Sequence, residues 1–120
     1  MQLLLIALAG AVGALARYGI GVAAGPQPYP WATLGINVAG SFLLGGLLTV
    51  APRLPEPLSV ALAVGLLGAF TTFSTFSAET LVLLRTGHIV AAMSYATASV
   101  VLGLAGAAFG YWLLRTMTSS

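Results

Sequence analysis

The sequence TTFSTFS, at residues 71–77, places five hydroxyl side chains and two phenyl rings inside a strongly apolar region. Hydroxyls both donate and accept hydrogen bonds, and a phenyl ring has a positive edge and a negative face. Neutral donors of this kind can bind an anion without holding it too long for conduction. The alternative is simple packing, in which the rings stack and the hydroxyls bond to their own helix. On these residues alone, packing is the commoner outcome.

The same region is a poor helix former. Gly65 and Gly68 precede a β-branched, hydroxyl-rich run, and both features disfavour a continuous helix. We expect a break near the middle of a membrane span, where freed backbone must be buried in protein or bind something. Exposed carbonyl oxygens there would suit a small cation, and exposed amides would suit an anion.

Polar side chains also occur in the other apolar segments. They are Arg17, Asn37, Ser41, Tyr95, Thr97 and Ser99, together with Glu79 just after the TTFSTFS run. The Asn37 amide is a further hydrogen-bond donor. Tyr95 and Ser99 are four residues apart on one helix face, so they either extend a polar track or form interhelical hydrogen bonds. Arg17 and Glu79 are ionisable groups within apolar spans, and for Glu79 we prefer pairing with Arg17 or across subunits.

The composition is that of an integral membrane protein. Hydrophobic residues make up 59% of the 120 residues and charged residues only 5%, with a mean hydropathy of +1.05. A soluble domain carries about 25% charged residues. The four basic residues are scattered arginines, which argues against nucleic-acid binding, and there is no cysteine for disulfides or thiolate metal sites. No nucleophile–base pair, phosphate loop or metal cluster is evident, so we do not expect an enzyme.

Four segments are long enough to cross a membrane, which needs roughly 20 apolar residues. They are residues 3–24, 31–51, 58–84 and 89–114. They are separated by GPQPYP (25–30), PRLPEP (52–57) and RTGH (85–88). We interpret the first as a retained span, because it lacks preceding basic residues and three more apolar segments follow. The predicted fold is all-α, with residues 1–120 forming one four-helix transmembrane domain.

The arginines give almost no preference for one orientation in the membrane. Arg53 and Arg115 would lie on one side, and Arg85 on the other, joined by Arg17 if its side chain reaches the interface. Such a weak bias favours insertion both ways round, and the two orientations can then form an antiparallel two-fold dimer. Four helices are also too few to enclose a protected pathway. Dual orientation is therefore our hypothesis.

Three motifs carry a resemblance to a known family. GAVGALARY (10–18), TLGINVAGSFLLG (33–45) and GLLGAFTTFSTFSAE (65–79) resemble the Fluc/CrcB family of fluoride channels. The resemblance implies a dual-topology homodimer of two antiparallel subunits, each with a third helix broken near the bilayer midplane. It also implies two fluoride pathways, passive export of cytoplasmic fluoride as a resistance mechanism, and a multi-pass location in the plasma (inner) membrane of a prokaryote.

The resemblance also implies roles for individual residues. Phe73 and Phe76 look like the two pore phenylalanines, whose ring edges contact fluoride. The polar residues that match the family's pathway are Asn37, Ser74, Thr75, Tyr95 and Ser99. The next position of the fourth-helix track is Gly103, so solvent or another donor must substitute there.

A central structural sodium ion is implied as well, held by the backbone carbonyls of Gly68 and Thr71. Ala69 stands where the family usually has a second glycine, a change that carbonyl coordination survives. Arg17 matches the first-helix arginine, and Glu79 matches the acid after the break.

Two other functions remain open. A small dual-topology multidrug or cation transporter would need a carboxylate in an early helix, but residues 1–51 contain neither Asp nor Glu. A non-transporting membrane assembly factor would use small-residue surfaces to bind larger membrane proteins, and it leaves TTFSTFS without a role. Loss of coupled transport on replacing Glu79 would indicate the transporter, and absence of any ion flux would indicate the assembly factor.

Overall fold

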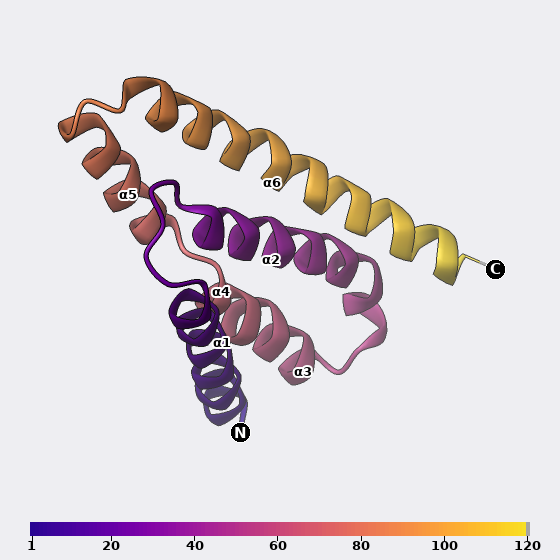
Figure 1. Ribbon diagram of the computed structural model, residues 1–120. Helices are drawn as coiled ribbons and strands as arrows, with labels where there is room; N and C mark the ends of the chain where they lie inside the picture. Colours follow the sequence, from indigo (N-terminus) through magenta and orange to yellow (C-terminus); the bar gives the residue numbers. More distant parts are fainter. Residues whose placement is uncertain (120) are drawn as a thin grey trace.

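The computed structural model describes residues 1–119, and every regular element in that range is helical (Figure 1). Four stretches are long and apolar enough to cross a membrane, which confirms the predicted number of spans. They are Gln2–Ala24, Trp31–Arg53, Glu56–Arg85 and Ile89–Thr118.

Three of the spans are regular α-helices. They are α1 (Gln2–Ala24), α2 (Trp31–Val50), which continues into the short 3₁₀ turn η1 (Ala51–Arg53), and α6 (Ile89–Thr118). Helix α6 runs four residues past its expected end at residue 114, and side-chain donors bond to its last carbonyls. Thr118 Oγ1 donates to the carbonyl of Leu114 at 2.7 Å, and Arg53 Nη2 donates to the carbonyl of Thr118 at 3.3 Å.

The third span consists of several pieces. Helix α3 (Glu56–Val60) leads into a π-helix, η2 (Ala61–Leu67), then into α4 (Gly68–Phe70), and α5 (Phe73–Arg85) follows after two non-helical residues. Pro57 lies in the first turn of α3, although the sequence placed it in the loop. The first turn tolerates proline because its N–H groups have no helical partner.

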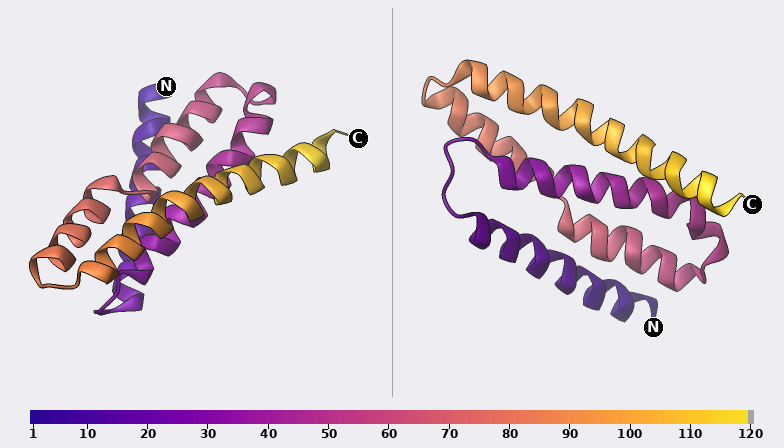
Figure 2. Two further views of the ribbon diagram at one scale, coloured as in Figure 1. Left: turned by 90° about the horizontal axis from the view of Figure 1, so that it is seen from above. Right: turned by 45° about the vertical axis from the view of Figure 1, so that its right-hand side comes forward.

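The helices pair in a way that changes along the third span. Helix α2 packs along α6, α1 lies beside η2 and α4, and α5 packs against α6. Figures 1 and 2 show the third span beside α1 before the interruption and beside α6 after it. The third span therefore changes its neighbour between Phe70 and Phe73, from α1 to α6, as it runs alongside α2.

Glycines permit the closest helix contacts. A Cβ atom at Gly45 of α2 would overlap the carbonyl oxygen of Ala107 on α6, and one at Gly110 of α6 would overlap that of Phe42. Gly13 of α1 meets the carbonyl of Leu66 in η2 in the same way. Close backbone approach of this kind stabilises helix pairs in lipid, where apolar burial adds little.

The buried core lies where α2, α5 and α6 meet. Leu34, Leu83, Ala92 and Tyr95 form it, with Phe76 among the half-buried residues packed against it. Helix α1 buries only Gly13, so most of its apolar surface faces outward. That surface is available to lipid or to another protein chain.

Candidate functional site

The interruption of the third span is formed by Thr71 and Thr72. Both have extended backbones, with φ −82°, ψ 158° at Thr71 and φ −149°, ψ 118° at Thr72. Thr72 caps α5, because its Oγ1 accepts a hydrogen bond from the Thr75 amide at 3.1 Å. The Thr71 hydroxyl instead donates to the carbonyl of Leu67 at 2.9 Å. The two threonines thus end one helical piece and begin the next.

Asn37 of α2 satisfies the backbone that this interruption frees. Its Nδ2 donates to the Thr72 carbonyl at 2.9 Å, and its Oδ1 accepts from the Thr72 amide at 2.8 Å. An asparagine amide group has two N–H donors, so one remains for another partner. The side chain predicted to line a pathway therefore also holds the interruption in place.

At the interruption, two of the backbone carbonyls that lose their usual helical donors are those of Gly68 and Thr71. In a continuous helix, the amides of Thr72 and Thr75 would bond to the carbonyls of Gly68 and Thr71. Here the first amide bonds to Asn37 and the second to the Thr72 hydroxyl. Their diversion leaves hard oxygen atoms of the kind that bind small cations.

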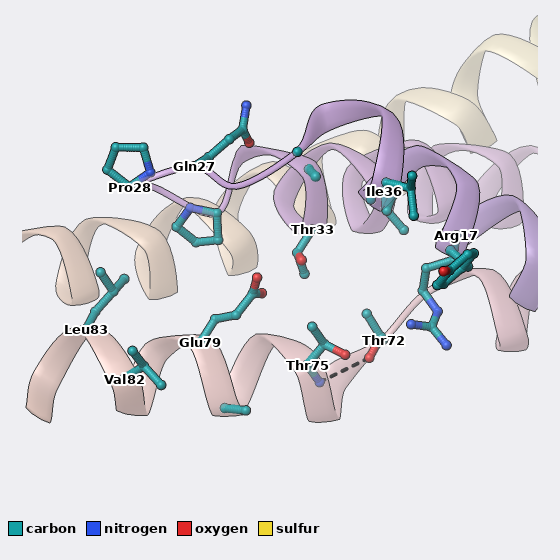
Figure 3. Close-up of a pocket in the computed structure, with 17 residues that line it drawn as sticks. Arg17, Gln27, Pro28, Thr33, Ile36, Thr72, Thr75, Glu79, Val82 and Leu83 are labelled. Atoms are coloured by element: carbon teal, nitrogen blue, oxygen red, sulfur yellow. Dashed lines mark hydrogen bonds between the residues drawn. The ribbon is translucent and has the colours of Figure 1, made fainter.

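Most of the predicted residues line one of two cavities, whereas Ser74 and Tyr95 line neither. The larger, of about 580 Å³, has Arg17, Thr33, Thr75 and Glu79 among its lining residues (Figure 3). The smaller, of about 320 Å³, is lined by residues of α2, the third span and α6. Its polar and aromatic lining comprises Asn37, Ser41, Thr71, Thr72, Phe73, Phe76 and Ser99, and Gly68 also borders it. Thr72 lines both cavities.

The two phenyl rings lie close together but in different surroundings. Their centroids are 5.7 Å apart with the planes inclined at 48°. Phe76 also lies against Tyr95, at 5.1 Å, and is half-buried, whereas Phe73 is 78% exposed. The Phe76 ring thus packs against the core, whereas most of the Phe73 ring is exposed.

Tyr95 and Glu79 form an interhelical hydrogen bond. The Tyr95 side chain is fully buried, and its hydroxyl donates to Glu79 Oε1 at 3.0 Å. Arg17 Nε donates to the carbonyl of Ala69, just before the interruption, at 3.3 Å. Within the chain, the two ionisable side chains therefore bond to different partners, and Figure 3 shows Arg17 near Thr72 and Glu79 below Thr33.

Ser74 and Ser99 have contrasting environments. Ser74 is exposed and borders neither cavity. The Ser99 Oγ is buried and has no hydrogen-bond partner within residues 1–119. A buried hydroxyl at a cavity wall without a protein partner can form a hydrogen bond to a ligand in that cavity.

The sequence interpretation did not assign Thr33 or Ser41 to the site. Thr33 is buried and lines the larger cavity, and Ser41 lines the smaller one. Both are four residues from Asn37, so the three share one face of α2. This four-residue spacing is the signal that could have identified them.

Comparison with known proteins places the chain in a family. Residues 4–111 match the model of the family described as CrcB-like protein, Camphor Resistance (CrcB). The chain belongs to the CrcB-like family. The resemblance seen in the sequence motifs is thereby confirmed.

Curated relatives of this CrcB-like chain are named as fluoride-specific ion channels. A protein of Thermus thermophilus is 48% identical, covering 92% of this chain and 91% of its own length. One from Salinibacter ruber is 45% identical (92% and 86%), and one from Nitrobacter hamburgensis is 38% identical (96% and 96%). The first two are named fluoride-specific ion channel FluC, and the third fluoride-specific ion channel FluC 1. These are names of channels and not of enzymes, as the sequence predicted for this chain.

Proposed function

We propose that this protein is a fluoride-selective channel that lets fluoride leave the cytoplasm passively. Its family and the names of its relatives support the substrate. The observation that carries the proposal is the interrupted third span beside a cavity lined by an amide, hydroxyls and two phenyl rings. Fluoride is small and strongly hydrated, so replacing its water requires several closely spaced donors.

In the proposed pathway, no group carries a full positive charge. The second N–H of Asn37 and the hydroxyls of Ser74, Thr75 and Ser99 act as donors, and the ring edges of Phe73 and Phe76 offer weak positive charge. Tyr95 matches the family's pathway but lines neither cavity, so we give it a positioning role: it donates to Glu79 and packs against the Phe76 ring. Neutral donors bind an anion weakly enough for it to move on, and a narrow array excludes the larger chloride.

The working unit is proposed to be an antiparallel homodimer with two pathways, the third helix of each subunit being broken near the bilayer midplane. Phe73 supports this, because it lines the smaller cavity yet is 78% exposed in the single chain. A second copy laid on this face would cover it. Opposite insertion of the two copies agrees with the nearly balanced arginines. A tag on the C-terminus found on one membrane side only would contradict this arrangement.

A structural sodium ion is proposed at the dimer interface, held by the carbonyls of Gly68 and Thr71 from each subunit. The diverted amides of Thr72 and Thr75 support this assignment, since they leave these two oxygens without their helical donors. When bound, the cation supplies a positive charge that holds the two interruptions together. Arg17, which bonds to the neighbouring carbonyl of Ala69, stabilises the same backbone.

The proposed location is the plasma (inner) membrane of a prokaryote, with four spans per subunit. Hydrogen fluoride crosses membranes in its neutral form and dissociates inside the cell. A fluoride-selective leak then lets the trapped anion run back out. This would make the protein a fluoride-resistance factor.

The test is fluoride efflux from liposomes that contain the purified protein, followed with a fluoride electrode. Valinomycin makes potassium permeable, and chloride efflux is followed in parallel. We expect fluoride loss without chloride loss, and its abolition by Phe76→Ile. Phe109→Ile is the matched control, because Phe109 stacks on Phe42 and borders neither cavity.

Other outcomes would favour the two alternatives. Transport that requires a proton gradient and disappears in Glu79→Gln would indicate a coupled transporter. No ion flux above that of empty liposomes, from protein shown to be a folded dimer, would indicate an assembly factor.

A further inference from the structure

The hydroxyl of Ser99 on α6 differs from most others on these helices. Thr71, Thr80 and Thr118 each donate to a carbonyl one turn earlier in their own helix, as such residues commonly do. The Ser99 Oγ is buried and has no partner within residues 1–119. It borders the smaller cavity, together with Asn37 and both phenyl rings. The cavity is the open space beside this hydroxyl, and a ligand there is within its reach.

One turn further along α6, the same face carries no side chain. Position 103 is a glycine, and a Cβ atom built there would lie 3.8 Å from the Oγ of Ser41 on α2. This is an ordinary contact distance, so the site has room for a small side chain. The hydroxyl nearest to this position therefore comes from the other helix.

Ser41 lines the same cavity as Ser99. It lies four residues after Asn37 on one face of α2, is half-buried, and lines the smaller cavity. Helices α2 and α6 are in close contact here, since a Cβ at Gly106 would lie 3.2 Å from the carbonyl oxygen of Val38. Ser41 and Ser99 thus face one space from two tightly packed helices.

We infer that Ser41 is a fluoride-contacting residue, and that it supplies the hydroxyl that position 103 lacks. Ser41 and Ser99 together place two hydroxyls in the same part of the proposed fluoride pathway, one helical turn beyond Asn37. Both hydroxyls are neutral donors and can orient toward an anion in the cavity. This inference rests on the proposed fluoride-channel function, and adds to it a residue on α2.

The test moves the hydroxyl from one helix to the other. We expect Ser41→Ala to slow fluoride efflux from liposomes about tenfold, since hydrogen bonds to charged groups are among the stronger ones. The double variant Ser41→Ala/Gly103→Ser is expected to recover most of the efflux. Ser41→Ala/Gly103→Ala is the matched control, because it fills the same space without a hydroxyl, and it should stay slow. Gel filtration checks that each variant is folded.

Three results would overturn the inference. Efflux through Ser41→Ala at the unmodified rate would show that the hydroxyl is not used. Equal rescue by Gly103→Ala and Gly103→Ser would show that only packing matters. If Ser41→Ala does not fold, Ser41→Cys keeps the shape but offers a weak donor, and unmodified efflux through it would also contradict the inference. The unmodified chain separates the two proposals, because absence of fluoride efflux there refutes the channel itself.

Discussion

The third and fourth spans have the same length, but only the fourth is continuous. Glu56–Arg85 and Ile89–Thr118 each contain 30 residues and are both apolar enough to cross a membrane. The fourth is the single helix α6, whereas the third is divided by the extended residues Thr71 and Thr72. Glycine does not explain the difference, because α6 has three glycines, at positions 103, 106 and 110, and is uninterrupted.

The difference lies in what the neighbouring helix α2 offers. At the interruption it presents Asn37, which bonds to both backbone groups of Thr72. Beside the α6 residue Gly110 it presents its own helical backbone, at Phe42 and Gly46. Because an unsatisfied backbone group in hydrocarbon costs several kcal/mol, a helix in a membrane can open only where a partner is at hand. Helix α2 thus pairs with the freed backbone of the third span and packs its own backbone against the continuous fourth span.

The largest effect is expected from removing this partner. Asn37→Ala leaves the amide and the carbonyl of Thr72 unpaired, and should lower the free energy of unfolding by about 3 kcal/mol. We also expect loss of fluoride efflux. Unfolding in detergent micelles by titration with SDS measures the first effect. For stability alone, Ser41→Ala, one turn along the same helix, is the control, and equal stability of the two variants would contradict the role given to Asn37.

The second-largest effect is expected from crowding the close contact between α2 and α6 at Gly45. In Gly45→Ala, the new methyl group overlaps the carbonyl of Ala107, so α2 and α6 must separate, at a cost of about 2 kcal/mol. Gly35→Ala on the same helix meets no atom within 4 Å within the chain, and should be neutral or slightly stabilising. Thermal unfolding of both variants in detergent measures the difference. Similar midpoints would mean that close approach at Gly45 is not needed.

Much of the helix arrangement could be read from the sequence, because it depends on local composition. Apolar segments and the separators between them, two rich in proline and one with Arg and Gly, located all four spans, with ends that differ by a few residues from those in the structure. The region 65–77 was also identified as a poor helix. Which two residues leave the helix was not predictable, because that depends on Asn37, which is 35 residues away in the chain.

The site was harder to predict where one side chain has several possible hydrogen-bond partners. An isolated sequence does not reveal that Tyr95 bonds to Glu79, or that Arg17 bonds to the carbonyl of Ala69. The π-helix at Ala61–Leu67 was also missed, since its residues resemble those of any apolar helix and its packing against α1 is a tertiary feature. The stripe of Thr33, Asn37 and Ser41 on α2 was within reach, because its four-residue spacing is visible in the sequence.

The smallest effect separates the cap of α5 from the Asn37 pairing. Thr72→Val keeps the shape and the backbone bonds to Asn37, and loses only the hydroxyl that accepts from the Thr75 amide. We expect a loss of about 1 kcal/mol, typical of a removed N-cap, with the fold retained. Thr80→Val removes a hydroxyl that donates to the Phe76 carbonyl inside the continuous part of α5, and should cost less, because that carbonyl keeps its helical partner. SDS titration compares the two. If Thr80→Val costs as much as Thr72→Val, the cap contributes nothing specific, and Asn37 alone holds the interruption open.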